Sequence, residues 1–329
     1  MPELGPLESY TRPVVFFANG LGDTILALPA IRAVAKLFPQ RLSLVCDKGV
    51  HSALLSDLPF DRVVETRMER NVPDWTREFA AADVKRKLTG CDFFISLVPW
   101  HSRSLERLLE HLEPRSSIGF FDAFRIMVPL NFRQHASDLA FDVPRALDAS
   151  LRLEDYAAPL RSSPADRAVA LGIRESIPPR RRIMVVHADT GPNKMWPSGR
   201  FVKVLNAFLD QRPEFLALLV GTTRQTLDVG QNASRIIPCY GVPFGVTISL
   251  VAASDIFLGV DSSVLHIADL CRVPSVGLFG ASSVVEFGFR FSTASVVCDG
   301  RTMASIRTAA VLRALHRVVD RSDGRGRAL

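Results

Sequence analysis

Hydrophobic and polar positions alternate in blocks along the first half of the chain. Consecutive apolar residues predict buried strands at 13–18, 41–46, 62–66 and 92–98. Between them, apolar positions at helical spacing predict helices at 24–38, 51–56, 74–89 and 101–111. Apolar strands that alternate with helices indicate βαβ units and a parallel sheet covered on both faces.

A segment rich in proline, serine and charge, at 160–182, interrupts this rhythm, and a second series follows it. Its predicted strands are 182–187, 215–220, 255–260 and 275–279. Its predicted helices are 198–211, 222–234, 246–253 and 262–271, with a final amphipathic helix at about 303–319. We therefore predict two α/β domains joined near residues 165–180.

Composition adds few constraints to this pattern. With 47% hydrophobic and 22% charged residues, the chain has the balance of a soluble globular protein. The N-terminus MPELGPLESY lacks the basic start and apolar stretch of a secretory signal. The five cysteines form no CxxC pair and the histidines show no paired ligand spacing, so we expect reduced cysteines and no metal site. We expect a cytoplasmic protein.

The net charge of +6 is concentrated at one end of the chain. Residues 301–329 contain seven arginines and two aspartates, which gives +5, so the remaining chain is nearly neutral. This distribution argues against nucleic acid as a partner. Peripheral contact of the basic tail with an anionic membrane, such as the inner membrane face, stays open, although a solvated helix face explains the charge more simply.

The first candidate for chemistry is NGLGD at residues 19–23, where a predicted strand gives way to a helix. Ligands of open α/β sheets bind beyond the carboxyl ends of strands. Gly20 and Gly22 permit a tight turn, but no third glycine follows, so the dinucleotide fingerprint GxGxxG is incomplete. Asp23 either caps the following helix or acts as a general base towards a hydroxyl, and the spacing alone favours capping.

Two further strand-to-helix junctions lie in the second half. In HADTGPNKMWPSGRF, residues 187–201, Thr190 and Lys194 indicate either a phosphate site or a polar surface loop, with Ser198 as the N-cap of the next helix. In LGVDSSVLHIADL, residues 258–270, Asp261 and the following serines occupy a similar junction. In FGASSVVEFG, residues 279–288, Gly280 and Ser282 either close the same pocket or belong to an ordinary loop, and the sequence favours neither.

Together these segments resemble the bacterial heptosyltransferase family, glycosyltransferase family 9. NGLGDTILALP, HADTGPNKMWP and DSSVLH, followed by VPSVGLFGASS, are similar to the motifs of the family and follow its order over roughly residues 13–285. The resemblance implies the α/β fold GT-B, with two Rossmann-like domains facing across a cleft and the C-terminal helix packing back on the N-terminal domain.

The resemblance also implies a domain layout and an activity. The acceptor-side domain is 1–165, the linker 166–180, the nucleotide-sugar-binding domain 181–300, and the C-terminal helix with its basic tail 301–329. The activity is an inverting, metal-independent transfer of a sugar from a nucleotide-diphosphate donor such as ADP-heptose to a hydroxyl acceptor. A heptose is the first candidate for the sugar. The nucleotide sugar is a co-substrate, and no further cofactor is implied.

The family's functional positions fall on specific residues of this chain. Asp23 falls on the general base and Asn19, Gly20 and Gly22 on the acceptor-side loop. Thr190 and Lys194 fall on donor-phosphate contacts. The loop that grips donor phosphate and sugar corresponds to Asp261, Ser262, Ser263 and Val264, and His266 matches a motif position whose role is left open.

The chain also departs from the family pattern. Ser262-Ser263 replaces Thr-Gly, and GTTRQT at 221–226 lacks the acidic residue that some members use to hold the donor ribose. Few basic residues occur at 45–70, so the acceptor stays open between a lipopolysaccharide core and a natural-product intermediate. A non-catalytic nucleotide-binding protein of GT-B type is the alternative. A dinucleotide-dependent oxidoreductase is disfavoured because neither half contains GxGxxG.

Overall fold

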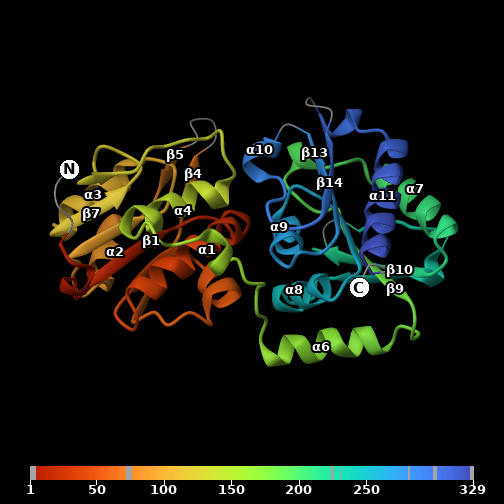
Figure 1. The fold of residues 1–329 in the computed structure, drawn as a ribbon, viewed down its shortest axis with the longest axis horizontal. Coiled ribbons are helices and arrows are strands. Elements are labelled where there is room, and N and C mark those ends of the chain that lie inside the picture. The colour runs from red at the N-terminus through yellow and green to blue at the C-terminus, as the bar shows by residue number, and fades with distance from the viewer. Residues whose placement is uncertain are drawn as a thin grey trace. The chain divides into compact units, whose positions relative to one another are not determined.

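The computed structural model describes residues 5–71, 76–223, 226–230, 232–280, 282–298 and 302–326. The chain forms two compact units, Met1–Ala158 and Pro159–Leu329. Each is built around a six-stranded sheet flanked by helices, which confirms the predicted α/β class (Figure 1). Within the described ranges, no helix combines the length and apolar character needed to cross a membrane.

The sheet of the first unit has the strand order β3-β2-β1-β6-β7-β8, and every neighbouring pair is parallel. Its strands are β1 (Pro13–Phe17), β2 (Ser43–Asp47), β3 (Arg62–Thr66), β6 (Phe93–Ser96), β7 (Ser116–Gly119) and β8 (Ile126–Met127). A separate antiparallel hairpin consists of β4 (Glu69–Asn71) and β5 (Thr76–Glu78). Strands β1 and β6 are buried along their whole length, as expected for the centre of a parallel sheet.

The helices of the first unit are α1 (Leu21–Leu37), α2 (Ala81–Lys87), α3 (Arg103–Leu112), α4 (Ala136–Leu147) and α5 (Leu153–Tyr156). Short helical turns occur at Leu7–Ser9 and His51–Leu55. Helix α3 illustrates local control by the sequence. Ser102 caps its start by accepting the N–H of Leu105 at 3.1 Å, and Glu113 ends it in the left-handed region, with φ 44°.

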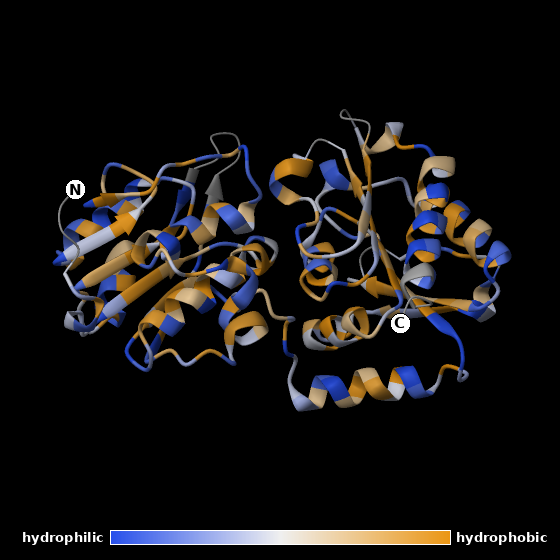
Figure 2. Ribbon diagram, viewed as in Figure 1, coloured by the Kyte–Doolittle hydropathy of each residue, from blue (hydrophilic) through white to orange (hydrophobic). Residues whose placement is uncertain are grey.

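The sheet of the second unit has the order β11-β10-β9-β12-β13-β14, again entirely parallel. Its strands are β9 (Arg182–His187), β10 (Phe215–Gly221), β11 (Ile236–Tyr240), β12 (Ile256–Val260), β13 (Ser275–Phe279) and β14 (Ala294–Cys298). Its helices are α6 (Pro164–Glu175), α7 (Ser198–Gln211), α8 (Phe244–Ala252), α9 (Ser263–Leu270), α10 (Val284–Phe287) and α11 (Thr308–Gly326). Short turns occur at Pro192–Lys194, Ala233–Arg235 and Met303–Ser305. Hydrophobic colours concentrate on the central strands of each unit (Figure 2).

The last helix, α11, packs within the second unit. Val311, Leu315 and Val318 are fully buried in the core formed by α7 and the strands of that unit. The apolar stripe of α11 packs beside α7 on the face of its own sheet. The contacts described for α11 lie within the second unit, and packing of the C-terminal helix on the N-terminal domain stays a prediction.

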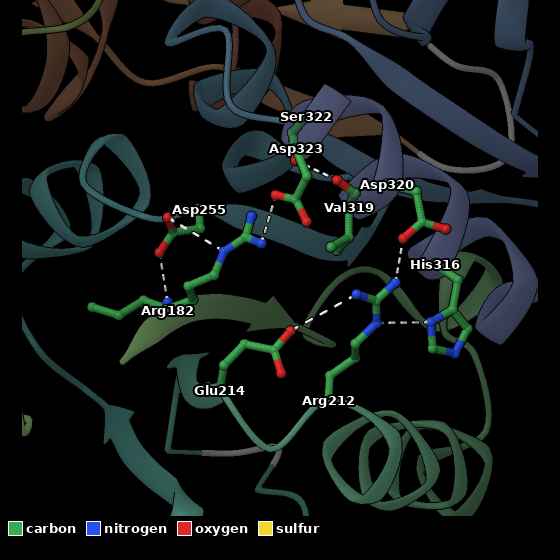
Figure 3. Close-up of polar contacts among 10 residues, drawn as sticks. Arg182, Arg212, Glu214, Asp255, His316, Val319, Asp320, Ser322 and Asp323 are labelled. Carbon is green, nitrogen blue, oxygen red and sulfur yellow. Dashed lines mark hydrogen bonds and ion pairs between the residues drawn. The ribbon is translucent and has the colours of Figure 1, made fainter. Parts of the chain in front are cut away.

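A polar network fixes α11 at the amino end of the second sheet (Figure 3). Arg182, the first residue of β9, bonds to Asp323 at 2.8 Å and lies 3.8 Å from Asp255. Arg212 pairs with Asp320 and donates from Nε to Nδ1 of His316 at 3.3 Å. These contacts lie at the opposite edge of the sheet from the carboxyl ends of the strands, so they support the fold.

All eight strands predicted from apolar runs form. The sequence analysis missed β4, β5, β7, β8, β11 and β14, which are short or lie at sheet edges. The helix predicted at 222–234 is wrong, because the described part of this segment contains only the turn Ala233–Arg235. The helix predicted at 74–89 is confined to α2, since β5 occupies Thr76–Glu78. Helix α6 lies within the second unit and covers most of the segment assigned to a linker.

Candidate functional site

The predicted motifs lie where the strand order of each sheet reverses. In the first sheet the reversal is between β1 and β6, and in the second between β9 and β12. Connections to the two sides of the sheet diverge at such a point and leave a crevice at the carboxyl ends of the strands. NGLGD follows β1, HADTGPNK includes the end of β9, and DSSVLH follows β12. Topology therefore places all three motifs at ligand-binding positions.

Lys194 and Asp261 form an ion pair at the reversal point of the second sheet. Nζ of Lys194 lies 2.6 Å from Oδ2 of Asp261. The Asp261 side chain is 3% exposed, whereas that of Lys194 is 38% exposed. An ammonium group has three donors, and the bond to Asp261 uses one. The lysine can thus stay anchored to a buried carboxylate while its other donors face a ligand.

Thr190 joins the two loops that carry this ion pair. Its Oγ1 donates to the main-chain oxygen of Asp261 at 3.0 Å. The loop after β9 and the loop after β12 are therefore connected directly. The predicted role of Thr190 in holding phosphate requires its hydroxyl to rotate away from this carbonyl oxygen.

The N-terminus of α9 is the third component of the site. Ser262 is its N-cap residue in an extended conformation, and its side chain makes no capping bond. The Ser262 hydroxyl oxygen is buried and has no hydrogen-bond partner among the described residues. The first bond within the helix joins the N–H of His266 to the carbonyl oxygen of Ser262, so the amides of Ser263 and Val264 lie before it. An uncapped helix start with a buried hydroxyl suits an anion.

Ser263, at the position where the family has glycine, begins α9 in ordinary helical conformation. It is absent from the residues with positive φ, so the backbone accommodates a Cβ there. His266 lies on the inner face of the same helix and is 5% exposed. Its Nε2 is 3.7 Å from Oδ1 of Asp261, which places the Asp261 carboxylate between His266 and Lys194. We interpret His266 as a residue that positions Asp261.

In the first unit, NGLGD forms the turn between β1 and α1. Gly20 is the N-cap residue of α1, and Gly22 and Asp23 lie in its first turn. The interpretation of Asp23 as the cap is therefore wrong. Its negative charge is nevertheless favourable there, because the first turn of a helix carries partial positive charge. The helix dipole accounts for a carboxylate at this junction, and the role of Asp23 as general base stays a prediction.

Two residues near Asn19 were missed by the sequence analysis. The Asn19 side chain is buried, and its Oδ1 accepts a bond of 2.5 Å from Nη1 of Arg77 in β5. The Arg77 guanidinium lies 5.4 Å from the centroid of the Trp100 ring, which follows β6. Trp100 lies two residues after the apolar run at 92–98, a position that could have marked it. Arg77 comes from the separate hairpin and left no such signal.

The sequence analysis also missed Asp269, a residue of α9 that fixes the backbone of residues 290–292. Its side chain is 2% exposed and accepts the backbone N–H groups of Arg290, Phe291 and Ser292 at 2.8 to 2.9 Å. These bonds explain why a charged residue is tolerated on the buried face of α9. Across the described ranges, His, Cys, Asp and Glu side chains form no group of three able to hold a metal ion.

Comparison with known proteins agrees with this architecture. The glycosyltransferase family 9 (heptosyltransferase) model matches residues 112–309. A glycosyltransferase family 9 protein from Veillonella parvula DSM 2008 is similar in structure, with a TM-score of 0.76, 18% identity, and coverage of 94% of this chain and 97% of that chain. No curated protein matches the sequence.

Two E. coli structures are similar as well. The ADP-heptose lps heptosyltransferase II has a TM-score of 0.67 and 14% identity, covering 95% of this chain and 99% of that chain. Heptosyltransferase WaaC with ADP has a TM-score of 0.67 and 13% identity, covering 93% and 99%. At these identities the likeness concerns the fold. With the family model spanning more than half of the sequence, the chain belongs to glycosyltransferase family 9, the heptosyltransferases.

Proposed function

We propose that this glycosyltransferase moves a sugar, a heptose first among the candidates, from a nucleoside-diphosphate donor to a hydroxyl acceptor, with inversion and without a metal ion. ADP-heptose is the first candidate donor because the two E. coli structures of similar fold are an ADP-heptose lps heptosyltransferase and a heptosyltransferase with ADP. The reaction is assigned to the cytoplasm, with membrane contact through the basic tail left open.

The observation that carries the proposal is the convergence of a cation and hydrogen-bond donors at the reversal point of the second sheet. Lys194, the N-terminus of α9 and the buried hydroxyl of Ser262 meet there. A diphosphate leaving group gains negative charge as the glycosidic bond breaks. Fixed donors and a cation stabilise that charge in the transition state. The same groups supply the role that a divalent cation fills in many phosphate sites.

Asp23 is the proposed general base of the first unit. As the acceptor oxygen attacks the anomeric carbon from the face opposite the diphosphate, the Asp23 carboxylate takes the hydroxyl proton. Attack from that face inverts the configuration of the anomeric carbon. Asn19, Gly20 and Gly22 form the acceptor-side turn around this carboxylate. A positioned base of this kind contributes about 10²- to 10⁴-fold to a rate.

The acceptor class stays open between a lipopolysaccharide core and a natural-product intermediate. Arg77 over Trp100 adds a cation and an aromatic face to the first unit, a combination that suits a sugar or an anionic acceptor. The family to which the chain belongs consists of glycosyltransferases. The alternative is that this particular chain binds the nucleotide sugar without transferring the sugar.

The test is a panel of ADP-heptose, ADP-glucose, UDP-glucose and GDP-mannose incubated with the intact chain in the presence of EDTA. We expect slow donor hydrolysis, with release of the nucleoside diphosphate from one donor above all others. The anomeric configuration of the initial product, followed by NMR, reports inversion. Release that requires an added divalent metal contradicts the metal-independent reaction. Tight donor binding with no release and no transfer supports the non-catalytic alternative.

A further inference from the structure

Consecutive residues after β9 contact opposite neighbours of that strand. Thr190 donates to the main chain of Asp261, which follows β12. Asp189 points to β10 instead, where its Oδ2 accepts the backbone N–H of Thr222 at 3.0 Å and also the Thr222 hydroxyl. Strand β9 lies between β10 and β12. Its carboxyl end therefore has a cationic, phosphate-binding side towards β12 and a carboxylate on the side towards β10.

The end of β10 is shaped to admit this carboxylate. Gly221 has φ +151°, and a Cβ built on it would lie 3.3 Å from the Cβ of Asp189 and 3.6 Å from Nδ1 of His187. The buried His187 ring donates from Nδ1 to the Val220 carbonyl oxygen at 3.1 Å, and this bond holds the backbone directly before Gly221. Any larger residue at 221 would crowd both side chains in a strained backbone conformation.

The carboxylate also has unused capacity for a ligand. Both of its hydrogen bonds use Oδ2, and Oδ1 accepts none from the residues that the structure describes. Asp189 is partly exposed, and Thr222 and Thr223 beside it are exposed. An ionised carboxylate only accepts hydrogen bonds and repels phosphate. A ligand group that fits here carries hydroxyl donors.

We infer that Asp189 binds the ribose hydroxyls of the nucleoside-diphosphate donor, an inference that rests on the proposed function. In doubly wound sheets that bind dinucleotides, the diphosphate lies at a helix N-terminus and an acidic residue beyond the second strand binds the ribose. Here the residues directly after the second strand, Thr222 and Thr223, are not acidic. The loop after β9 supplies the carboxylate at that place. The nucleotide then crosses the end of β9, with its ribose towards β10 and its diphosphate towards β12.

The test is the difference in affinity between ribose and deoxyribose ligands. ADP, GDP, UDP and CDP are titrated into the full chain by calorimetry, and the tightest is then compared with its 2′-deoxy and 3′-deoxy forms. We expect one deoxy form to bind about 10-fold more weakly to the wild-type chain, in line with one lost charge-assisted hydrogen bond. Asp189→Ala should bring this gap to within about twofold, and the isosteric Asp189→Asn should reduce it partially.

Two controls separate recognition of ribose from other effects. Asp228→Ala removes an exposed carboxylate from the loop beyond β10 and should leave the gap intact. Lys194→Met should weaken the ribose and deoxyribose ligands by the same factor, because its proposed contact is the diphosphate.

Three outcomes overturn the inference. If Asp189→Ala weakens every ligand equally and keeps the gap, Asp189 only joins the ends of β9 and β10, and the proposed function stands. If the wild-type chain binds a nucleoside diphosphate with no gap for either deoxy form, ribose recognition by Asp189 is wrong while donor binding survives. If none of the four nucleoside diphosphates binds, the proposed function fails together with the inference.

Discussion

The two sheets share a strand order but differ in the charged residues that lie where that order reverses. In both, the first strand of the unit is central, with its second and third strands on one side and the other three on the other. In both, a helix begins at the reversal point without a side-chain cap, α1 after Gly20 and α9 after Ser262. The first turn of α1 contains Asp23, whereas the first turn of α9 contains no acidic residue and has Lys194 beside it.

Under the proposed function, this difference lets one backbone pattern serve two kinds of ligand. Both helix starts carry the partial positive charge of the helix dipole. In α1 the Asp23 carboxylate offsets that charge, so the turn disfavours phosphate and suits a hydroxyl that must lose a proton. At the start of α9 the carboxylate of Asp261 is paired with Lys194, and the amides of the first turn remain available for an anion. Under the proposed function, the first junction serves proton transfer and the second serves phosphate binding.

The largest expected effect comes from removing the acid of the first unit. Asp23→Asn should lower turnover by about 10³-fold, because the amide cannot take the acceptor proton. Donor affinity should change by less than about twofold if the two helix starts have separate roles. Steady-state transfer and donor calorimetry measure the two quantities.

Asp122→Asn is the matched control, since Asp122 is an exposed carboxylate of the same unit. It should leave turnover unchanged. Wild-type turnover in Asp23→Asn would remove the proposed base, and a parallel loss of donor affinity would remove the division of roles between the two helix starts.

The second effect concerns the cation of the second unit. Lys194→Met should weaken nucleoside-diphosphate binding by about 30- to 100-fold, which corresponds to about 2–3 kcal/mol for a charge-assisted contact. The same change strands the buried Asp261 carboxylate, so part of the loss is repulsion of the ligand. Calorimetry with the tightest-binding nucleoside diphosphate measures the loss.

The double variant Lys194→Met with Asp261→Asn separates these contributions, because it removes the stranded charge as well. We expect it to recover part of the affinity and no more. Lys203→Met, an exposed lysine on α7, serves as the control for a change in net charge. Unchanged affinity in Lys194→Met would mean that phosphate binding does not use this ion pair.

The smallest effect concerns the last residue of each central strand, which is Phe17 in β1 and His187 in β9. Burial lowers the pKa of His187 below its ordinary value of 6.5. The unfolded chain then binds a proton at this residue more readily than the folded chain. Stability from the neutral ring is complete above pH 6.5 and declines as the pH falls from 6.5 towards the folded pKa, by at most about 1.4 kcal/mol for each pH unit.

Chemical unfolding at pH 7.5 and 5.5 tests this expectation. His187→Gln, which keeps an N–H donor, should lose less stability between the two pH values than the wild-type chain. Burial also lowers the pKa of His316, but that residue is present in both chains and its contribution cancels in the comparison. Equal pH dependence in the two chains would show that His187 does not couple protonation to folding.

The sequence predicted the centre of each sheet better than its margins. Central strands such as β1 and β12 are buried on both faces, so their continuous apolar runs were unambiguous. The edge strand β11 contains Pro238, and β14 is largely half-exposed, so neither shows a continuous apolar run. The segment 222–234 was predicted as a helix, but its described part is the irregular connection between the paired strands β10 and β11.

The candidate site divides in a similar way. Motifs of several adjacent residues were visible in the sequence, and the structure brings Thr190, Lys194 and Asp261 into contact. Contacts between distant single residues were not visible. The pairing of Arg77 with Asn19, and the reach of Asp189 to Thr222, depend on which loops lie next to each other.

By itself, the sequence determined the α/β class, the central strands and the three strand-to-helix junctions, because apolar periodicity and short motifs are local properties. Tertiary structure decided the rest. In the folded protein α11 is buried in its own unit, and Gly20 is the N-cap residue of α1. Asp189 bonds to the loop after β10, whereas Thr190 bonds to the loop after β12, on the other side of β9. Those outcomes follow from strand order and side-chain packing, which join residues far apart in the chain and leave no periodic trace in it.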